Sequence, residues 1–133
     1  QAAIAREIAA GLAPRAKPVL LLSGGELTVT RTGDGVGGPN AEFCLALAFA
    51  LGGAPGIHAI ACDTDGVDGA AEVAGAVVGP ETLAKARDAG WDAGAALRRN
   101  DAHSFFAAVG GQVVTGPTLT NVNDFRAVLI LPG

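Results

Sequence analysis

Acidic, amide and hydroxyl side chains are concentrated in four short segments of a chain whose apolar residues are mainly alanine, valine and leucine. These segments are Ser23 to Glu26, Gly35 to Glu42, Asp63 to Asp68 and Thr115 to Asp124. They fall at the ends of apolar runs and in loops, and ligands of open α/β sheets bind at the ends of strands. The four segments therefore contain the candidate catalytic and binding residues.

Three carboxylates lie within six positions in the third segment, at Asp63, Asp65 and Asp68. Such a group could hold Mg²⁺, or one carboxylate could act as a general base. The spacing is similar to the start of an EF-hand loop, but no glutamate occupies the closing position, which argues against a calcium loop. Aspartate and glycine also favour turns whatever their function, so a purely structural turn stays open as an alternative.

A glycine pattern of the form G-x-G-x-x-G is formed by Gly33, Gly35 and Gly38 between a predicted strand and a predicted helix. It allows three interpretations. It could be a dinucleotide fingerprint, although Glu42 in the first helical turn would repel a pyrophosphate. It could be a turn that needs glycine for backbone geometry alone. It could also present backbone N–H groups and a helix N-terminus to a phosphate or carboxylate, which is the interpretation we favour.

The remaining polar candidates are less specific. Asn121 and Asn123 could orient a hydroxylated substrate or satisfy their own turn. His58 lies in a predicted strand and is expected to be a core or edge residue, and His103 is expected to serve at the start of a helix. Cys62 has no histidine beside it in the sequence, so we do not expect a thiolate nucleophile.

The elements that must position these residues alternate between strands and helices. Apolar and β-branched runs predict strands at residues 19–22, 27–30, 57–62, 112–115 and 127–131. Helical spacing with capping residues predicts helices at residues 2–11, 41–51, 81–89, 92–99 and 104–109, the second of them capped by Asn40. This order predicts an α/β protein, a three-layer α/β/α sandwich, and the short turn between the first two strands predicts a mixed sheet.

Length and composition narrow the class of protein. The 133 residues suit a single domain, 1–133, with one core, in which Trp91 is expected to be a packing residue. A net charge of −4 with no basic cluster argues against nucleic-acid partners, and no apolar run is long enough for a membrane span. Two cysteines cannot form a disulfide framework, so a cytoplasmic location is expected. The absence of methionine suggests that the chain is a fragment of a longer polypeptide.

Taken in order, the polar segments resemble a known family. Ser23 to Glu26, Gly35 to Phe43, Asp63 to Gly69, Asn100-Asp101 and Thr115 to Asp124 are similar to the motifs of the MOFRL domain. This is the C-terminal domain of the class II glycerate 2-kinases, which are also known as hydroxypyruvate reductases. The resemblance extends from about Val19 to Leu131, which is nearly the whole chain.

The resemblance implies ATP-dependent phosphorylation of the 2-hydroxyl of D-glycerate, a small hydroxy acid, in a cleft between this domain and a larger N-terminal α/β domain. ATP with Mg²⁺ would serve the full-length enzyme, and no tightly bound cofactor is expected in this domain alone. By motif position, Asp65 would be the leading acidic catalytic residue, with Asn40 and Glu42 nearby. The expected substrate-binding residues are Ser23, Gly24, Gly25, Gly37, Gly38, Thr64, Asp68, Asn121 and Asn123.

The chain departs from the family pattern at several positions. The glycine-rich block usually reads G-G-R-N-Q-E, but here Pro39 replaces the arginine and Ala41 the glutamine. Asp63 and Leu119 stand where glycine is frequent. Loss of an arginine beside a phosphoryl group removes a charge clamp, so either another cation has been recruited or the kinase activity is altered. An NAD(P)-dependent hydroxypyruvate reductase and a non-catalytic anion-binding or docking module are the alternatives.

Overall fold

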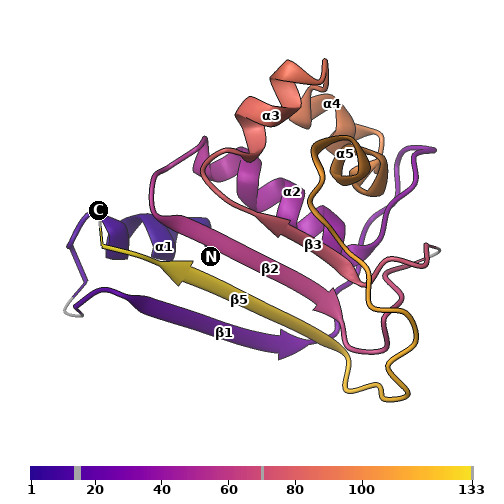
Figure 1. Cartoon of the computed structure of the whole chain (residues 1–133), viewed down its shortest axis with the longest axis horizontal. Coiled ribbons are helices and arrows are strands. Elements are labelled where there is room, and N and C mark those ends of the chain that lie inside the picture. Colours follow the sequence, from indigo (N-terminus) through magenta and orange to yellow (C-terminus); the bar gives the residue numbers. More distant parts are fainter. Residues whose placement is uncertain (14–15, 70, 133) are drawn as a thin grey trace.

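The fold is one five-stranded sheet with five helices, seen in a computed structural model that describes residues 1–13, 16–69 and 71–132 (Figure 1). The helices are α1 (Ala2–Ala9), α2 (Pro39–Leu51), α3 (Thr82–Asp88), α4 (Ala93–Arg98) and α5 (Ala102–Val109). The strands are β1 (Val19–Gly25), β2 (Ile57–Asp63), β3 (Gly75–Val78), β4 (Gln112–Val113) and β5 (Asp124–Ile130). The α/β class expected from the sequence is confirmed.

The sheet has the strand order β1-β5-β2-β3-β4, and every neighbouring pair is antiparallel. The expectation of a mixed sheet is therefore wrong. It rested on a second strand at residues 27–30, but this segment is not a strand in the structure. The partner of β1 is instead β5 from the far end of the chain, which runs in the opposite direction.

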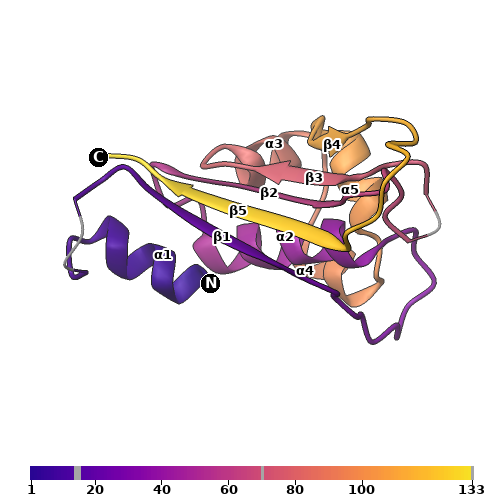
Figure 2. The same ribbon diagram turned by 90° about the horizontal axis from the view of Figure 1, so that it is seen from below.

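The core lies between the sheet and helices α1 and α2, with α4 and α5 packed against α2 (Figure 2). Small side chains such as Ala41, Ala61 and Ala76 are fully buried where α2 crosses the strands, which allows the helix to lie close to the sheet. Phe105 is also fully buried, and Trp91 meets it edge-to-face with ring centroids 6.3 Å apart. Full burial of a side chain such as Phe105 contributes about 1.5–3 kcal/mol. Trp91 is thus the packing residue that the sequence predicted.

The opposite face of the sheet is apolar and largely uncovered within the described part of the chain, with Thr82 and Lys85 of α3 at its edge. Leu20, Leu22, Val77 and Phe125 point to this face and are each more than 40% exposed. A hollow of about 770 Å³ lies on it, beside His58. Thus only two layers are present here, and the third layer of the expected α/β/α sandwich is not in the described residues. The sequence predicted that layer because its strands alternate with helices, and because the apolar run at residues 19–22 is typical of a strand buried on both faces.

Other local expectations were partly correct. The predicted helices and the strands at 57–62 and 127–131 exist with shifted ends, the strand predicted at 112–115 shortens to Gln112–Val113, and β3 was not predicted. Asn40 does not cap α2, because the helix begins at Pro39 after Gly38. Proline suits the first helical position because it has no N–H group to satisfy there. Among the described residues, no helix is long and apolar enough to cross a membrane.

Candidate functional site

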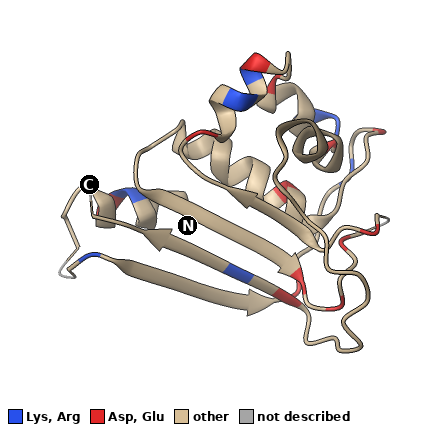
Figure 3. Ribbon diagram, viewed as in Figure 1, with Lys and Arg blue, Asp and Glu red and all other residues tan. Residues whose placement is uncertain are grey.

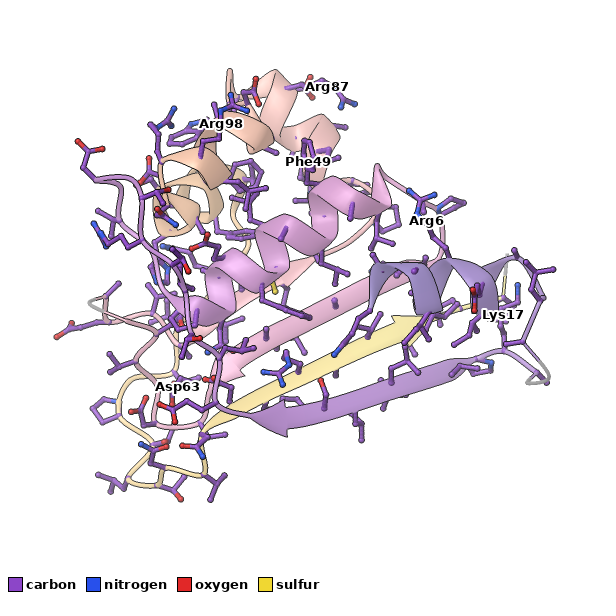
Figure 4. The ribbon with its side chains drawn as sticks, turned by 180° about the vertical axis from the view of Figure 1, so that it is seen from behind. Arg6, Lys17, Phe49, Asp63, Arg87 and Arg98 are labelled. Carbon is purple, nitrogen blue, oxygen red and sulfur yellow. The ribbon has the colours of Figure 1, made fainter. Side chains whose placement is uncertain are left out.

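The four polar segments meet at one end of the sheet, because β1 and β2 run in the same direction on either side of β5. Asp124 at the start of β5 pairs with Gly25 at the end of β1 and with Asp63 at the end of β2. Figure 4 shows Asp63 at this end of the sheet and Arg6 and Lys17 at the other end. Several of the acidic residues coloured in Figure 3 lie at the same end, in the loops and strand ends there. We call it the polar end of the sheet.

Two of the polar loops are bonded directly to each other. The backbone N–H and the hydroxyl of Thr64 donate to the Asn123 carbonyl over 3.0 and 2.7 Å, and the Thr64 hydroxyl accepts from Val122 N–H over 2.9 Å. The Thr118 hydroxyl donates to the Thr64 carbonyl. Asn121 accepts from the N–H of Asn123 within its own turn. Thr64, Asn121 and Asn123 are thus brought together as the sequence suggested, although much of their hydrogen bonding holds the loops.

The carboxylate of Asp68 is fully buried and occupies the N-terminal end of α2. It accepts from the backbone N–H groups of Asn40 and Ala41 over 2.9 and 2.8 Å, and from the Asn40 side-chain amide over 3.2 Å. His103, also buried, places Nε2 2.9 Å from the Asp68 carbonyl and 3.4 Å from its carboxylate. The positive end of the α2 dipole therefore already has an anion of the protein's own.

Asn40 links two carboxylates in the interior. Its Nδ2 donates to Asp124 Oδ1 over 2.7 Å as well as to Asp68, and the second Asp124 oxygen accepts from Leu27 N–H over 2.6 Å. This hydrogen bond directs the chain out of the sheet after Gly25, the last residue of β1. Residues 27–30 therefore form no strand. Asn40 is fully buried, and its Oδ1 has no partner among the described residues. In this structure Asn40 connects α2, β5 and the Asp68 loop.

The glycine-rich loop is fixed against the segment between α4 and α5. Gly35 N–H donates to the Arg99 carbonyl over 2.8 Å, and Val36 N–H donates to the Asp101 carboxylate over 2.9 Å. A Cβ added to Gly33 would lie 2.3 Å from the Arg99 oxygen, and one added to Gly35 would lie 2.4 Å from the Asp101 Cβ. These glycines are needed for contact with the protein's own backbone.

Gly37 and Gly38 are subject to the same constraint. A Cβ at Gly37 would lie 2.7 Å from the Asn100 carbonyl oxygen, and one at Gly38 would lie 2.4 Å from that of Asp68. The N–H groups of Gly33, Gly35, Asn40 and Ala41 are all bonded to acceptors of the protein itself, so these four groups are not open to a pyrophosphate. The interpretation that the turn needs glycine for close packing accounts for this pattern.

Asp65 lies at the surface of the polar end. Its Oδ1 accepts from Val67 N–H over 2.8 Å, and its backbone N–H donates to Asp63 Oδ1 over 3.1 Å. Burial raises the pKa of Asp63, and the neighbouring carboxylates of Asp65 and Asp124 raise it further, while the bond from Asp65 N–H opposes the rise. The three acids therefore form a crowded negative site, which fits a cation bound beside it.

A complete metal centre is not formed by this part of the protein. In residues 1–13, 16–69 and 71–132, no three His, Cys, Asp or Glu side chains are arranged to hold a metal ion. A Mg²⁺ ion that bridges phosphates keeps several waters and needs only one or two protein carboxylates. Asp63 and Asp65 could supply carboxylates of that kind.

Several residues that organise the polar end had weak signals in the sequence. Asn100 was noted only as part of a motif, and its side chain bonds both the glycine-rich loop and Glu42. His103 starts α5 as expected, but it also reaches Asp68. Arg126 donates to the Ser23 hydroxyl and the Gly24 carbonyl, and so orders the end of β1. The contacts of these residues span many positions in the chain, which local patterns do not reveal.

The two cysteines are poor nucleophiles. Burial raises the pKa of Cys62 to about 11, and the charge of Asp68 adds to the rise. Burial also raises the pKa of Cys44 well above its ordinary range. His58 lies exposed on the apolar sheet face, away from the polar end. No thiolate chemistry is therefore expected from either cysteine.

Known proteins with similar sequences and structures place this chain in a family. The model of the MOFRL family matches residues 19–124, so the chain belongs to the MOFRL family. The D-glycerate 2-kinase of Thermotoga maritima is 38% identical over 130 residues, which are 98% of this chain and 31% of that protein. A solved structure of glycerate kinase from the same organism superposes with a TM-score of 0.94.

Another relative has a different name. A protein of Agrobacterium vitis with the provisional name hydroxypyruvate reductase is 56% identical over 119 residues, which are 88% of this chain and 27% of that protein. The chain therefore spans about a third or less of the length of these curated relatives. Its described residues correspond to one part of such a protein.

Proposed function

We propose that this chain is the MOFRL part of a longer glycerate 2-kinase that transfers a phosphoryl group from ATP to the 2-hydroxyl of D-glycerate. The observation that carries the proposal is the meeting of four polar loops at one end of the sheet, with Asp65 at their surface. Similarity to proteins named D-glycerate 2-kinase and glycerate 2-kinase supports the same reaction. ATP with Mg²⁺ would supply the phosphoryl group and shield its charge.

Within this proposal the chain's own residues divide into two groups. Asp65 would meet the substrate, either accepting the proton of the 2-hydroxyl or holding the cation beside the phosphates. Gly24 and Gly25 at the exposed end of β1, together with Thr64, would contact the hydroxy acid. Asn40 and Asp68, which are fully buried, would act by holding α2 and the Asp65 loop in register.

We also propose that the rest of the longer polypeptide, an α/β domain N-terminal to this one, covers the apolar face of the sheet. The outward-facing strand residues there, among them Leu20, Leu22 and Phe125, include no Asp, Glu, Lys or Arg within the described strands. A face of this kind marks an interface. Leu22→Glu in the full-length protein should separate the unfolding of the two parts, whereas Leu12→Glu, at a more exposed leucine after α1, should not.

The kinase proposal is tested by assaying phosphoglycerate formation by the full-length protein with D-glycerate and Mg-ATP. Product should form, and Asp65→Asn should reduce kcat by about 100-fold or more. Asp88→Asn, at an exposed acid on α3, is the matched control and should leave the rate unchanged. Folded full-length protein that forms no product would overturn the proposal.

A hydroxypyruvate reductase is the second candidate, favoured by the name of the Agrobacterium relatives. It receives little support from the glycine-rich loop, whose glycines contact Arg99, Asn100, Asp101 and Asp68. Oxidation of NADH or NADPH in the presence of hydroxypyruvate by the full-length protein would establish it. A non-catalytic module remains the expectation if neither activity is found in folded protein.

A further inference from the structure

We propose that Asn100 is a positioning residue that fixes the carboxylate of Glu42 and the glycine-rich loop to one point. This inference rests on the kinase proposal and on the expectation from motif position that Glu42 lies near the catalytic Asp65. The Asn100 side chain is 4% exposed and lies between α4 and α5, 58 positions from Glu42. It acts through hydrogen bonds to two other segments.

The amide oxygen of Asn100, its first arm, binds the glycine-rich loop. Its Oδ1 accepts from the backbone N–H groups of Thr32 and Gly33, each over 2.8 Å. Both acceptor positions of the amide oxygen are thereby used. Gly33 also packs against the Arg99 backbone, where an added Cβ would lie 2.3 Å from the Arg99 oxygen.

The amide nitrogen of Asn100, its second arm, binds Glu42. Asn100 Nδ2 donates to Glu42 Oε1 over 2.9 Å and to Oε2 over 3.1 Å. An amide is the neutral group of this size that can accept from two N–H donors on one side and donate to a carboxylate on the other. Aspartate would keep the first arm but would face Glu42 with a second negative charge.

The backbone agrees with this assignment. Asn100 has φ +54°, in the left-handed region that asparagine tolerates better than most side chains. Its carbonyl oxygen also contacts the Gly37 backbone, where a Cβ would lie 2.7 Å away. Asn100 therefore combines an unusual backbone shape with a fully used side chain, and both serve the junction of the loop, α2 and α4.

Three variants of the full-length protein separate positioning from simple stabilisation. Asn100→Asp keeps the bonds to Thr32 and Gly33 and breaks only the Glu42 arm. Glu42→Gln removes the charge but can still accept from Asn100. The double variant N100D/E42Q reverses the direction of the hydrogen bond, because the new amide at position 42 would donate to the new carboxylate at position 100. The double variant also keeps one negative charge in the pair but transfers it from position 42 to position 100.

We expect N100D and E42Q each to lower kcat/KM for D-glycerate by on the order of 10- to 100-fold. The amides of Thr32 and Gly33 should remain slow to exchange with solvent in N100D. The double variant should regain the wild-type Tm and yet stay at the activity of E42Q. Asn100→Gly, which keeps the left-handed backbone and deletes both arms, should speed exchange at Thr32 and Gly33.

The proposal is overturned if N100D keeps wild-type kcat/KM, or if the double variant regains activity together with stability. Either result would make the pair structural only. If the wild-type full-length protein phosphorylates no glycerate, the kinase proposal fails separately. Hydrogen exchange and Tm would then still test the two sets of hydrogen bonds made by Asn100. Unchanged exchange of the Thr32 and Gly33 amides in Asn100→Gly would reject the contact to the loop.

Discussion

The carboxylate of Asp68 accepts hydrogen bonds from both the backbone N–H and the side-chain amide of Asn40, across 28 positions of sequence. A residue from a distant loop thus takes the role that an N-cap side chain performs locally in most helices. Because Asp68 follows Asp65 by three residues, the same contact sets the position of the candidate catalytic carboxylate relative to α2. Packing of the helix and geometry of the site are coupled through this one pair.

Replacing Asp68 should destabilise the fold strongly. Asp68→Ala leaves the backbone N–H groups of Asn40 and Ala41 without their buried acceptor, while His103 keeps the backbone carbonyl of residue 68, and we expect a cost of about 3–5 kcal/mol. Asp92→Ala, at the exposed N-cap of α4, is the control and should cost about 1 kcal/mol. Denaturant unfolding of the full-length protein measures both. Equal losses for the two variants would contradict a special role of Asp68.

The glycine-rich loop should tolerate no added methyl group. Gly35→Ala places Cβ against the Asp101 side chain at 2.4 Å, so either the loop moves or the α4–α5 junction does. We expect a loss of about 2 kcal/mol or more, with faster exchange of the Val36 amide. Gly94→Ala in α4, whose Cβ would have ordinary contacts at 3.4 Å, should be neutral or stabilising by up to about 1 kcal/mol.

Restoring arginine at position 39 tests the effect of the departure from the family motif. Pro39 is at the first position of α2, which accepts other residues, so Pro39→Arg should lower stability by less than about 1 kcal/mol. The new guanidinium would stand beside the acidic polar end and could neutralise a phosphoryl group. We expect kcat/KM to rise by about tenfold or more.

The matched variant Pro39→Gln loses the proline ring in the same way but adds no charge. Comparing the two by steady-state kinetics isolates the contribution of the guanidinium. If both variants show the same rate, this site does not rely on a cation at position 39, and another group neutralises the phosphoryl charge.

Asp63 should make the fold less stable at neutral pH than at acidic pH. Its pKa is raised in the folded protein by burial and by Asp65 and Asp124, so the ionised form is penalised there. That penalty is complete above the raised pKa and disappears below the unfolded value of 3.8. Asp63→Asn, which keeps the acceptor for Asp65 N–H, should therefore raise Tm at about pH 7, and the gain should shrink as pH falls.

Thermal unfolding across this pH range checks the prediction, with Asp88→Asn as the exposed control on α3. A gain for Asp63→Asn that stays constant with pH would show that the crowding of carboxylates is not its cause. Addition of Mg-ATP should reduce the difference between Asp63→Asn and wild type if the cation binds beside these acids.

Much of the local structure could be predicted from the sequence. Apolar runs indicated the strands at 57–62 and 127–131, and the predicted helix at 41–51 ends at Leu51 as expected, followed by Gly52 in the left-handed conformation. Strand β3 was missed because Gly75 and Ala76 carry little β-propensity, and its place depends on pairing with β2. The strand expected at residues 27–30 has suitable residues but no partner, because the Asp124 carboxylate takes the Leu27 N–H.

The sequence by itself determined which residues are polar, where the turns fall and which family the motifs resemble, because these depend on residue type and short spacing. Tertiary structure alone decided the strand order, which places β5 between β1 and β2 and brings Gly25, Asp63 and Asp124 together. It also decided that Asp68 fills the N-terminus of α2 and that Asn100 reaches Glu42. Such contacts form only when distant segments are packed, since their energies come from burial and from hydrogen bonds that no local pattern specifies.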